Sequence, residues 1–179
     1  MHEKSFLRYL EIALNDKNEE LDVGGTGEIC VKGPQVMKGY WDLEEETEKA
    51  FTEDGYFRTG DIGYIGKDGE LYLVDRKKDM INVSGLKVYP QEIESVVNKH
   101  PSIVESGVIA APDDLTGEAV ALFVVKKDDD LTVSEIIGHM KEELTNYKIP
   151  KIVTFIDEIP KSPIGKLLRR EVRSFLPGT

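Results

Sequence analysis

The stretch DRKKDMI at residues 75–81 separates two regions of the chain that differ in sequence pattern. Before it, short apolar runs alternate with glycine-containing turns, such as GKDG at residues 66–69, as is typical of β-hairpins. After it, apolar runs alternate with amphipathic segments, which indicates mixed helices and strands. The sequence therefore predicts an α+β fold with two units, residues 1–77 and residues 78–179.

The first region is predicted to be rich in β-structure. We expect Tyr40 and Trp41 to be packing residues rather than ligands, because large aromatic side chains are usually buried. Cys30 is the only cysteine and lies in an apolar run, which predicts a buried, unreactive thiol. The expected strands are residues 9–14, 27–31, 62–65 and 70–74, and a short helix is expected at residues 43–51.

The second region is predicted to contain helices packed on strands. Pro90 suits the first position of a helix, and Thr132 followed by Glu135 is the signature of a capping box. β-branched residues predict core strands. The expected helices are residues 90–99, 132–144 and 166–175, and the expected strands are residues 103–110, 119–125 and 152–156.

Composition excludes some classes of function. The net charge of −11 argues against a nucleic-acid partner, because phosphate backbones require a basic surface. His2, His100 and His139 are scattered, so we expect surface histidines and no metal site. We see no signal peptide and no apolar run of the ~20 residues that a membrane span needs. These features predict a cytoplasmic location, with at most peripheral contact with the inner face of the membrane.

General motif reading stops short of a function, because no Walker-type phosphate loop and no serine–histidine–acid set is present. Four stretches, however, resemble the ordered motifs of the adenylate-forming enzyme superfamily. The residues of these motifs are most similar to those of bacterial long-chain fatty-acid–CoA ligases. The stretches are GEICVKGP with GYW at residues 27–34 and 39–41, YFRTGD at residues 56–61, DRKKDMI with Ser84-Gly85, and PKSPIGK at residues 160–166.

The resemblance implies a catalytic role for Lys166 and a nucleotide-binding role for Asp61 and Arg76. Lys166 would offset the repulsion between a carboxylate and the α-phosphate of ATP. It follows a Pro-Ile-Gly stretch that we expect to be flexible. Asp61 would accept hydrogen bonds from the ribose hydroxyls, and Arg76 would contact ribose or phosphate. The alternatives are a solvated lysine, a turn aspartate and an interdomain ion pair.

The same resemblance implies that the second unit moves relative to the rest of the parent enzyme. Lys78 matches the hinge position, about which the C-terminal domain would rotate between adenylation and thioester formation. Ser84, Gly85 and Leu86 would then line the path of the CoA pantetheine arm, with Gly85 allowing a close approach. A linker lysine and a structural turn glycine are the alternatives.

On this reading, residues 1–77 are the β-rich, barrel-like remnant at the end of a large N-terminal adenylating domain. Residues 78–179 form the mobile, small α+β C-terminal domain. The parent reaction converts a fatty acid, ATP and CoA into acyl-CoA, AMP and pyrophosphate, with Mg²⁺. The phosphate loop and acyl pocket are expected upstream of residue 1, so the chain alone should be inactive and bind no cofactor tightly. The rival readings are an amino-acid adenylation domain, an aryl-CoA ligase and a non-catalytic binding module.

Overall fold

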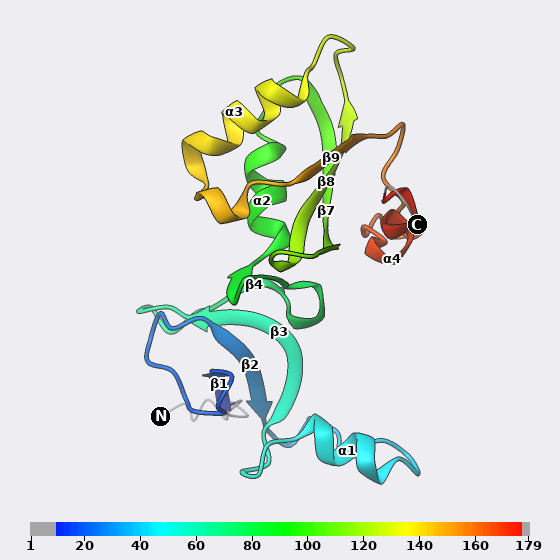
Figure 1. Ribbon diagram of the computed structural model, residues 1–179. Coiled ribbons are helices and arrows are strands. Elements are labelled where there is room, and N and C mark those ends of the chain that lie inside the picture. Colours follow the sequence, from blue (N-terminus) through cyan, green and yellow to red (C-terminus); the bar gives the residue numbers. More distant parts are fainter. Residues whose placement is uncertain (1–9, 177–179) are drawn as a thin grey trace, which may run out of the picture. The chain divides into compact units, whose positions relative to one another are not determined.

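The computed structural model describes residues 10–176, and the chain divides into two compact units. The first unit ends at Lys78, and the second begins at Asp79. Within residues 10–176, no helix is both long and apolar enough to cross a membrane. The prediction of an α+β fold is confirmed, because one unit is built mainly of strands and the other combines helices with a sheet (Figure 1).

The first unit is built on a four-stranded antiparallel sheet in the order β1-β2-β3-β4. The segment that contains α1 connects β2 to β3, and β3 and β4 form the hairpin predicted around residues 66–69. The predicted strand at residues 9–14 begins at Leu10 in the described part, since Tyr9 lies outside it. The elements are β1 (Leu10–Leu14), β2 (Gly27–Lys32), α1 (Glu44–Ala50), β3 (Phe57–Ile65) and β4 (Leu71–Arg76), followed by the 3₁₀ turn η1 (Lys77–Asp79).

The second unit is built on a five-stranded mixed sheet. Its order is β6-β5-β8-β7, and β9 pairs with β8 in parallel. The strands are β5 (Ile81–Val83), β6 (Leu86–Val88), β7 (Ile103–Asp113), β8 (Gly117–Lys126) and β9 (Ile152–Phe155). The helical elements are α2 (Pro90–Val97), α3 (Val133–Glu143), η2 (Asn146–Lys148), α4 (Arg169–Val172) and η3 (Arg173–Phe175).

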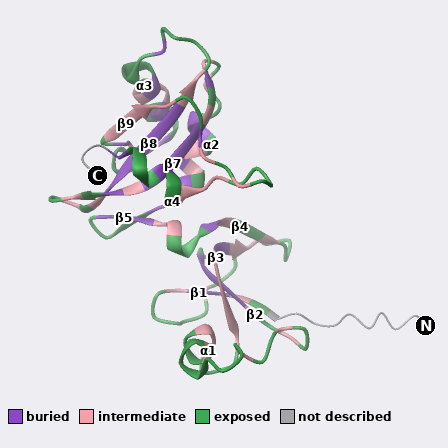
Figure 2. Ribbon diagram, turned by 90° about the vertical axis from the view of Figure 1, so that its right-hand side faces the viewer, coloured by how far each residue is buried: buried purple, intermediate pink, exposed green. Residues whose placement is uncertain are grey.

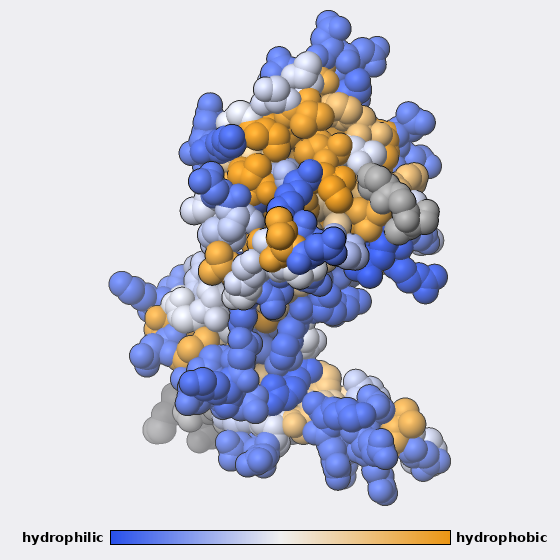
Figure 3. All heavy atoms as spheres, viewed as in Figure 1, coloured by the Kyte–Doolittle hydropathy of each residue, from blue (hydrophilic) through white to orange (hydrophobic). Residues whose placement is uncertain are grey.

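Both faces of this second sheet are covered, with α2 and α3 on one side and α4 on the other (Figure 1). Alternate residues of a strand point to opposite faces. Accordingly, Val120, Leu122 and Val124 of β8 belong to the apolar cluster under α2 and α3, and Ala121 and Phe123 belong to the cluster near α4. Figure 2 shows the resulting buried strands, and Figure 3 shows apolar residues gathered over this unit.

Three sequence expectations about side chains met different outcomes. Cys30 is completely buried, as predicted. Trp41 is 91% exposed and Tyr40 is also exposed, so the prediction that they pack in a core is wrong for the described residues. They lie on the segment before α1, a helix that buries none of its own residues. His100 and His139 are half-buried rather than on the surface, with their rings in edge contact; His2 lies outside the described residues.

The predicted helix at residues 166–175 is also wrong in its first part. The α-helix begins only at Arg169, and Lys166 lies in a hydrogen-bonded turn before it. The short strands β5 and β6 were not predicted, because three-residue apolar runs carry too little periodicity.

Candidate functional site

Asp61 and Arg76 face each other across the neighbouring strands β3 and β4 of the first unit. They are directly opposite in the strand register, and Arg76 Nε lies 2.7 Å from Asp61 Oδ1. The side chain of Asp61 remains 27% exposed and that of Arg76 57% exposed. Opposite charges on directly paired residues attract each other. The pair therefore leaves a charged carboxylate that a polar ligand can still reach.

The backbone before Asp61 is held in place by Thr59. The Thr59 hydroxyl donates to the Ile29 carbonyl at 2.7 Å and accepts from the Asp61 N–H at 3.0 Å. Gly60 between them has a φ of +71°, which a residue with a side chain adopts only at a cost. The sequence Thr59-Gly60-Asp61 therefore fixes where the Asp61 carboxylate projects.

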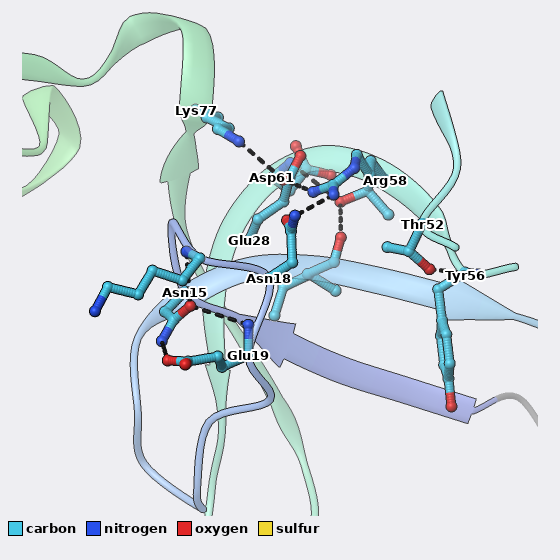
Figure 4. A network of polar contacts seen from close by, with 12 residues as sticks. Asn15, Asn18, Glu19, Glu28, Thr52, Tyr56, Arg58, Asp61 and Lys77 are labelled. Atoms are coloured by element: carbon cyan, nitrogen blue, oxygen red, sulfur yellow. Dashed lines mark hydrogen bonds and ion pairs between the residues drawn. The ribbon is translucent and has the colours of Figure 1, made fainter. Parts of the chain in front are cut away.

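Sequence reasoning missed a buried ion network in the same unit, centred on Glu28 (Figure 4). Glu28 Oε2 lies 2.9 Å from both Arg58 Nη1 and Lys77 Nζ, and only 7% of the Glu28 side chain is exposed. Arg58 also donates to Asn18 Oδ1 at 2.7 Å. The signal that could have revealed it is an acidic residue at an inward position of the otherwise apolar strand β2.

Burial beside this network accounts for the unreactive character of Cys30. Desolvation by burial, and after it the nearby negative charge of Glu28, raises the pKa of the Cys30 thiol from 9.0 to about 11. A thiol with this pKa is protonated at neutral pH and is a poor nucleophile. The predicted inert cysteine is thereby explained by position as well as by composition.

Lys78 lies in η1, at the end of the first unit, and its side chain is exposed. In the described part of the chain it forms no side-chain ion pair, although Lys77 before it and Asp79 after it both do. A residue whose side chain forms no ion pair can change its backbone angles without breaking one. This is what a pivot requires.

Ser84 and Gly85 form the tight turn between β5 and β6, and Leu86 is the first residue of β6. Ser84 and Gly85 both have positive φ values, 51° and 85°, as in the turns that close two-residue hairpins. The Ser84 N–H donates to the Thr116 carbonyl at 3.0 Å, and the Gly85 N–H donates to Asn82 Oδ1 at 2.8 Å. Leu86 is 48% exposed. The turn is thus fixed in shape and offers an open backbone surface.

Lys166 lies near the end of a small hairpin formed by residues 160–168, called the lysine hairpin below. Its own backbone N–H and carbonyl bond to Ser162, and Leu168 N–H donates to the Pro160 carbonyl at 2.9 Å. These bonds close the turn through its own backbone and the Ser162 hydroxyl. The Lys166 side chain is exposed and has no ion-pair partner within residues 10–176.

The predicted site residues therefore fall into two groups. Asp61 and Arg76 are brought together in the first unit. Ser84, Gly85, Leu86 and Lys166 belong to the second unit, on two separate turns. Residues 10–176 contain no group of three acidic, histidine or cysteine side chains that could hold a metal ion.

Comparison with known proteins gives a consistent result. Residues 92–166 match the family model described as the AMP-binding enzyme C-terminal domain. The chain is 52% identical over 159 residues to the long-chain-fatty-acid–CoA ligase of Yersinia pestis, and 44% identical over 150 residues to the 2-succinylbenzoate–CoA ligase of Bacillus mycoides. These matches cover 89% and 84% of this chain, but only 28% and 31% of the two relatives.

Among solved structures, ATP-bound MatB from Rhodopseudomonas palustris aligns with a TM-score of 0.85 at 36% identity. The alignment covers 93% of this chain and 33% of that structure. A match of this extent is longer than either compact unit, so it includes residues of both. The resemblance of the chain to the C-terminal region of adenylate-forming acyl-CoA ligases is confirmed.

Proposed function

Because residues 92–166 belong to the family of AMP-binding enzyme C-terminal domains, we propose that the chain supplies the C-terminal part of an ATP-dependent fatty-acyl-CoA ligase. The observation that carries the proposal is the 52% identity to a long-chain-fatty-acid–CoA ligase over 89% of the chain, which includes residues of both units. The proposal assigns the first unit to the end of a large adenylating domain and the second unit to its mobile C-terminal domain.

The proposed chemistry has two steps. In the first, a carboxylate oxygen of the fatty acid forms a bond to the α-phosphorus of ATP, and pyrophosphate leaves. In the second, the CoA sulfur forms a bond to the acyl carbon, AMP leaves, and the thiol proton is released. Magnesium enters with ATP as part of the substrate.

The residues of this chain fit distinct parts of these steps. The reachable Asp61 carboxylate would accept two ribose hydroxyl donors, and Arg76 beside it would contact ribose or phosphate oxygens. The unpaired Lys166 ammonium would stabilise the charge that accumulates as two anions approach. The fixed turn of Ser84, Gly85 and Leu86 would face the pantetheine arm in the second step, after rotation about Lys78.

A second candidate differs only in the acid. The 44% identity to a 2-succinylbenzoate–CoA ligase favours an aryl-acid ligase as the alternative parent. None of the site residues discussed above distinguishes the two acids, because ribose, phosphate and pantetheine are common to both reactions.

Two chimeras test the proposal. In one, the upstream part of the Yersinia pestis ligase is joined to this chain; in the other, the upstream part of the Bacillus mycoides ligase is used. Each chimera is compared with its intact relative in ATP–pyrophosphate exchange and in acyl-CoA formation. We expect the long-chain chimera to retain the larger fraction of its relative's rate, and the isolated chain to show no exchange.

A larger retained fraction in the 2-succinylbenzoate chimera would favour the aryl-acid alternative. Folded chimeras that both lack exchange would contradict the ligase proposal and favour a binding module. Turnover by the isolated chain would contradict the proposal that it is inactive alone.

A further inference from the structure

The lysine hairpin is docked on strand β7 by two side chains that flank Lys166. Lys161 forms an ion pair with Glu105 of β7. On the other side, Leu167 packs against Gly107 of the same strand, where an added Cβ would lie only 3.0 Å from Leu167 Cδ1. Glycine at position 107 thus makes room for Leu167. The hairpin rests on the sheet instead of projecting freely from it.

A third attachment follows the hairpin directly, at Arg169 in α4. Its guanidinium contacts Glu94 of α2 through two pairs of atoms, Nη1–Oε1 at 2.5 Å and Nη2–Oε2 at 3.2 Å. The side chains of Arg169 and Glu94 are only 17% and 14% exposed. A two-pronged contact of this kind fixes orientation as well as distance.

The same pair of side chains forms hydrogen bonds with backbone groups at the open edge of the sheet. β7 is an edge strand, so some of its backbone groups lack a neighbouring strand. At Val108, Glu94 Oε1 accepts from the backbone N–H at 2.8 Å, and Arg169 Nη1 donates to the backbone carbonyl at 2.5 Å. Arg169 and Glu94 therefore make the hydrogen bonds that a neighbouring strand would make at this point. These bonds attach α4 to β7 next to Gly107.

Arg169 also reaches the first residue of the second unit. Its Nε lies 3.7 Å from Asp79 Oδ2. Asp79 follows the predicted pivot Lys78 directly in sequence, and Arg169 follows Lys166 by three residues. One guanidinium group thus joins the segment that leaves the pivot to the segment that carries the lysine.

We propose that Arg169 is a positioning residue for Lys166, and this inference rests on the proposed function. Arg169, held by Glu94 and the Val108 carbonyl, keeps the lysine hairpin docked on β7, so that Lys166 moves only as the whole second unit moves. Arg169 does not touch the reacting atoms. It holds the hairpin against β7 and thereby fixes the position of Lys166 within the second unit.

The first experiment uses the chain of 179 residues and does not depend on catalysis. In a sample with labelled methyl groups, the nuclear Overhauser effect between a Leu167 methyl and Gly107 Hα reports docking. Arg169→Gln is expected to abolish it while contacts within the cluster under α2 and α3 remain. The neighbouring exposed arginine provides the matched control, and Arg170→Gln should leave the Leu167 signal unchanged.

Arg169→Lys keeps the charge but cannot contact both Glu94 oxygens and the Val108 carbonyl together, so it should weaken the signal partly. If Arg169→Gln does not fold, the Leu167–Gly107 signal of Arg169→Lys tests the proposal instead. A Leu167–Gly107 signal of full strength in either folded Arg169 variant overturns the proposal.

The second experiment uses the long-chain chimera and separates the two half-reactions. Misplacing a catalytic group by about 1 Å can cost on the order of 10²-fold in rate. Arg169→Gln should therefore lower ATP–pyrophosphate exchange at least about tenfold. Thioester formation from supplied acyl-adenylate should stay within about twofold, because Lys166 takes no part in it.

Equal losses in both half-reactions would indicate a merely structural role and overturn the positioning proposal. If the unsubstituted chimera shows no exchange, the proposed function fails, while the Leu167 signal still decides whether Arg169 docks the hairpin.

Discussion

In the second unit, apolar side chains form clusters on both faces of the sheet, whereas the first unit buries few apolar residues and places a charged network beside them. Among residues 10–78, the buried apolar side chains are Ala13, Leu14, Ile29, Cys30 and Ile62. Glu28 lies next to them with Arg58 and Lys77. On the visible face of the first unit, hydrophilic residues dominate (Figure 3).

The difference shows which residues each unit can lose without unfolding. Burial of one aliphatic side chain contributes about 1.5–3 kcal/mol to the free energy of folding. The two apolar clusters of the second unit are therefore expected to be its main source of stability. The first unit buries fewer apolar side chains and depends more on each polar contact. Exposed polar residues of the second unit without ion-pair partners among residues 10–176, such as Lys166, are therefore expected to contribute little to its stability.

The largest effect is expected for Lys166→Ala in the long-chain chimera. Removing one cation that stabilises transition-state charge should lower ATP–pyrophosphate exchange on the order of 10²-fold or more. The unfolding temperature should not change, since the side chain is exposed and has no ion-pair partner in the described part of the chain. Lys127→Ala removes another exposed lysine of the same unit and should leave exchange intact. Normal exchange in Lys166→Ala would remove this lysine from the mechanism.

The next largest effect is expected for Glu28→Gln, which tests the charged network of the first unit. A neutral amide cannot balance both Arg58 and Lys77, so two cations lose their charged acceptor near the core. A loss of about 1–3 kcal/mol is expected in the free energy of unfolding of the first unit. Urea denaturation of the isolated chain measures it. Glu11→Gln removes an exposed charge from the same sheet and should cost little; equal losses in both variants would show that burial of Glu28 is irrelevant.

The two units also differed in how far sequence reasoning could predict them. In the second unit, α2, α3, β7, β8 and β9 follow from periodicity and capping, because the apolar residues of the helices lie on one face and the strands are apolar on both faces. In the first unit, the GKDG turn predicted the hairpin, but no sequence pattern predicted the exposure of Trp41 or the ion network around Glu28. Those features depend on which segments meet in three dimensions, and an isolated strand pattern does not encode its partners.

The candidate site divides in a similar way. Motif resemblance singled out Asp61, Arg76 and Lys166, and the strand register places the first two together. It gave no indication of Arg169 or Glu94, which are 75 residues apart in the chain and meet only at the edge of β7. A positioning contact of this kind has no local pattern from which it could be inferred.

A smaller effect is expected at the start of α3, where the predicted capping box is present. The Thr132 hydroxyl accepts from Glu135 N–H, and Glu135 Oε2 accepts from Thr132 N–H at 2.8 Å. Thr132→Ala should cost about 1 kcal/mol in the free energy of unfolding of the second unit. Ser134→Ala, in the same first turn but without a capping role, is the control. A loss no larger than that of Ser134→Ala would show that the Thr132 side chain does not stabilise the start of α3.

The smallest effect is expected from an exposed carboxylate of the second unit, and it appears only in acid. A hydrogen bond from Lys151, and a further one from Thr116, lower the pKa of Asp113 from 3.8 to about 2. Because folding favours the ionised form, this contribution to stability is complete above the ordinary pKa and is lost as the pH falls from 3.8 towards 2. Asp113→Asn should therefore reduce the decline of the urea midpoint over this range, while Asp114→Asn, which removes the neighbouring exposed charge, should not. Since the lost interaction is open to solvent, the second unit should remain folded in both variants. Unfolding of Asp113→Asn at neutral pH would mean that this unit, too, depends on its charges.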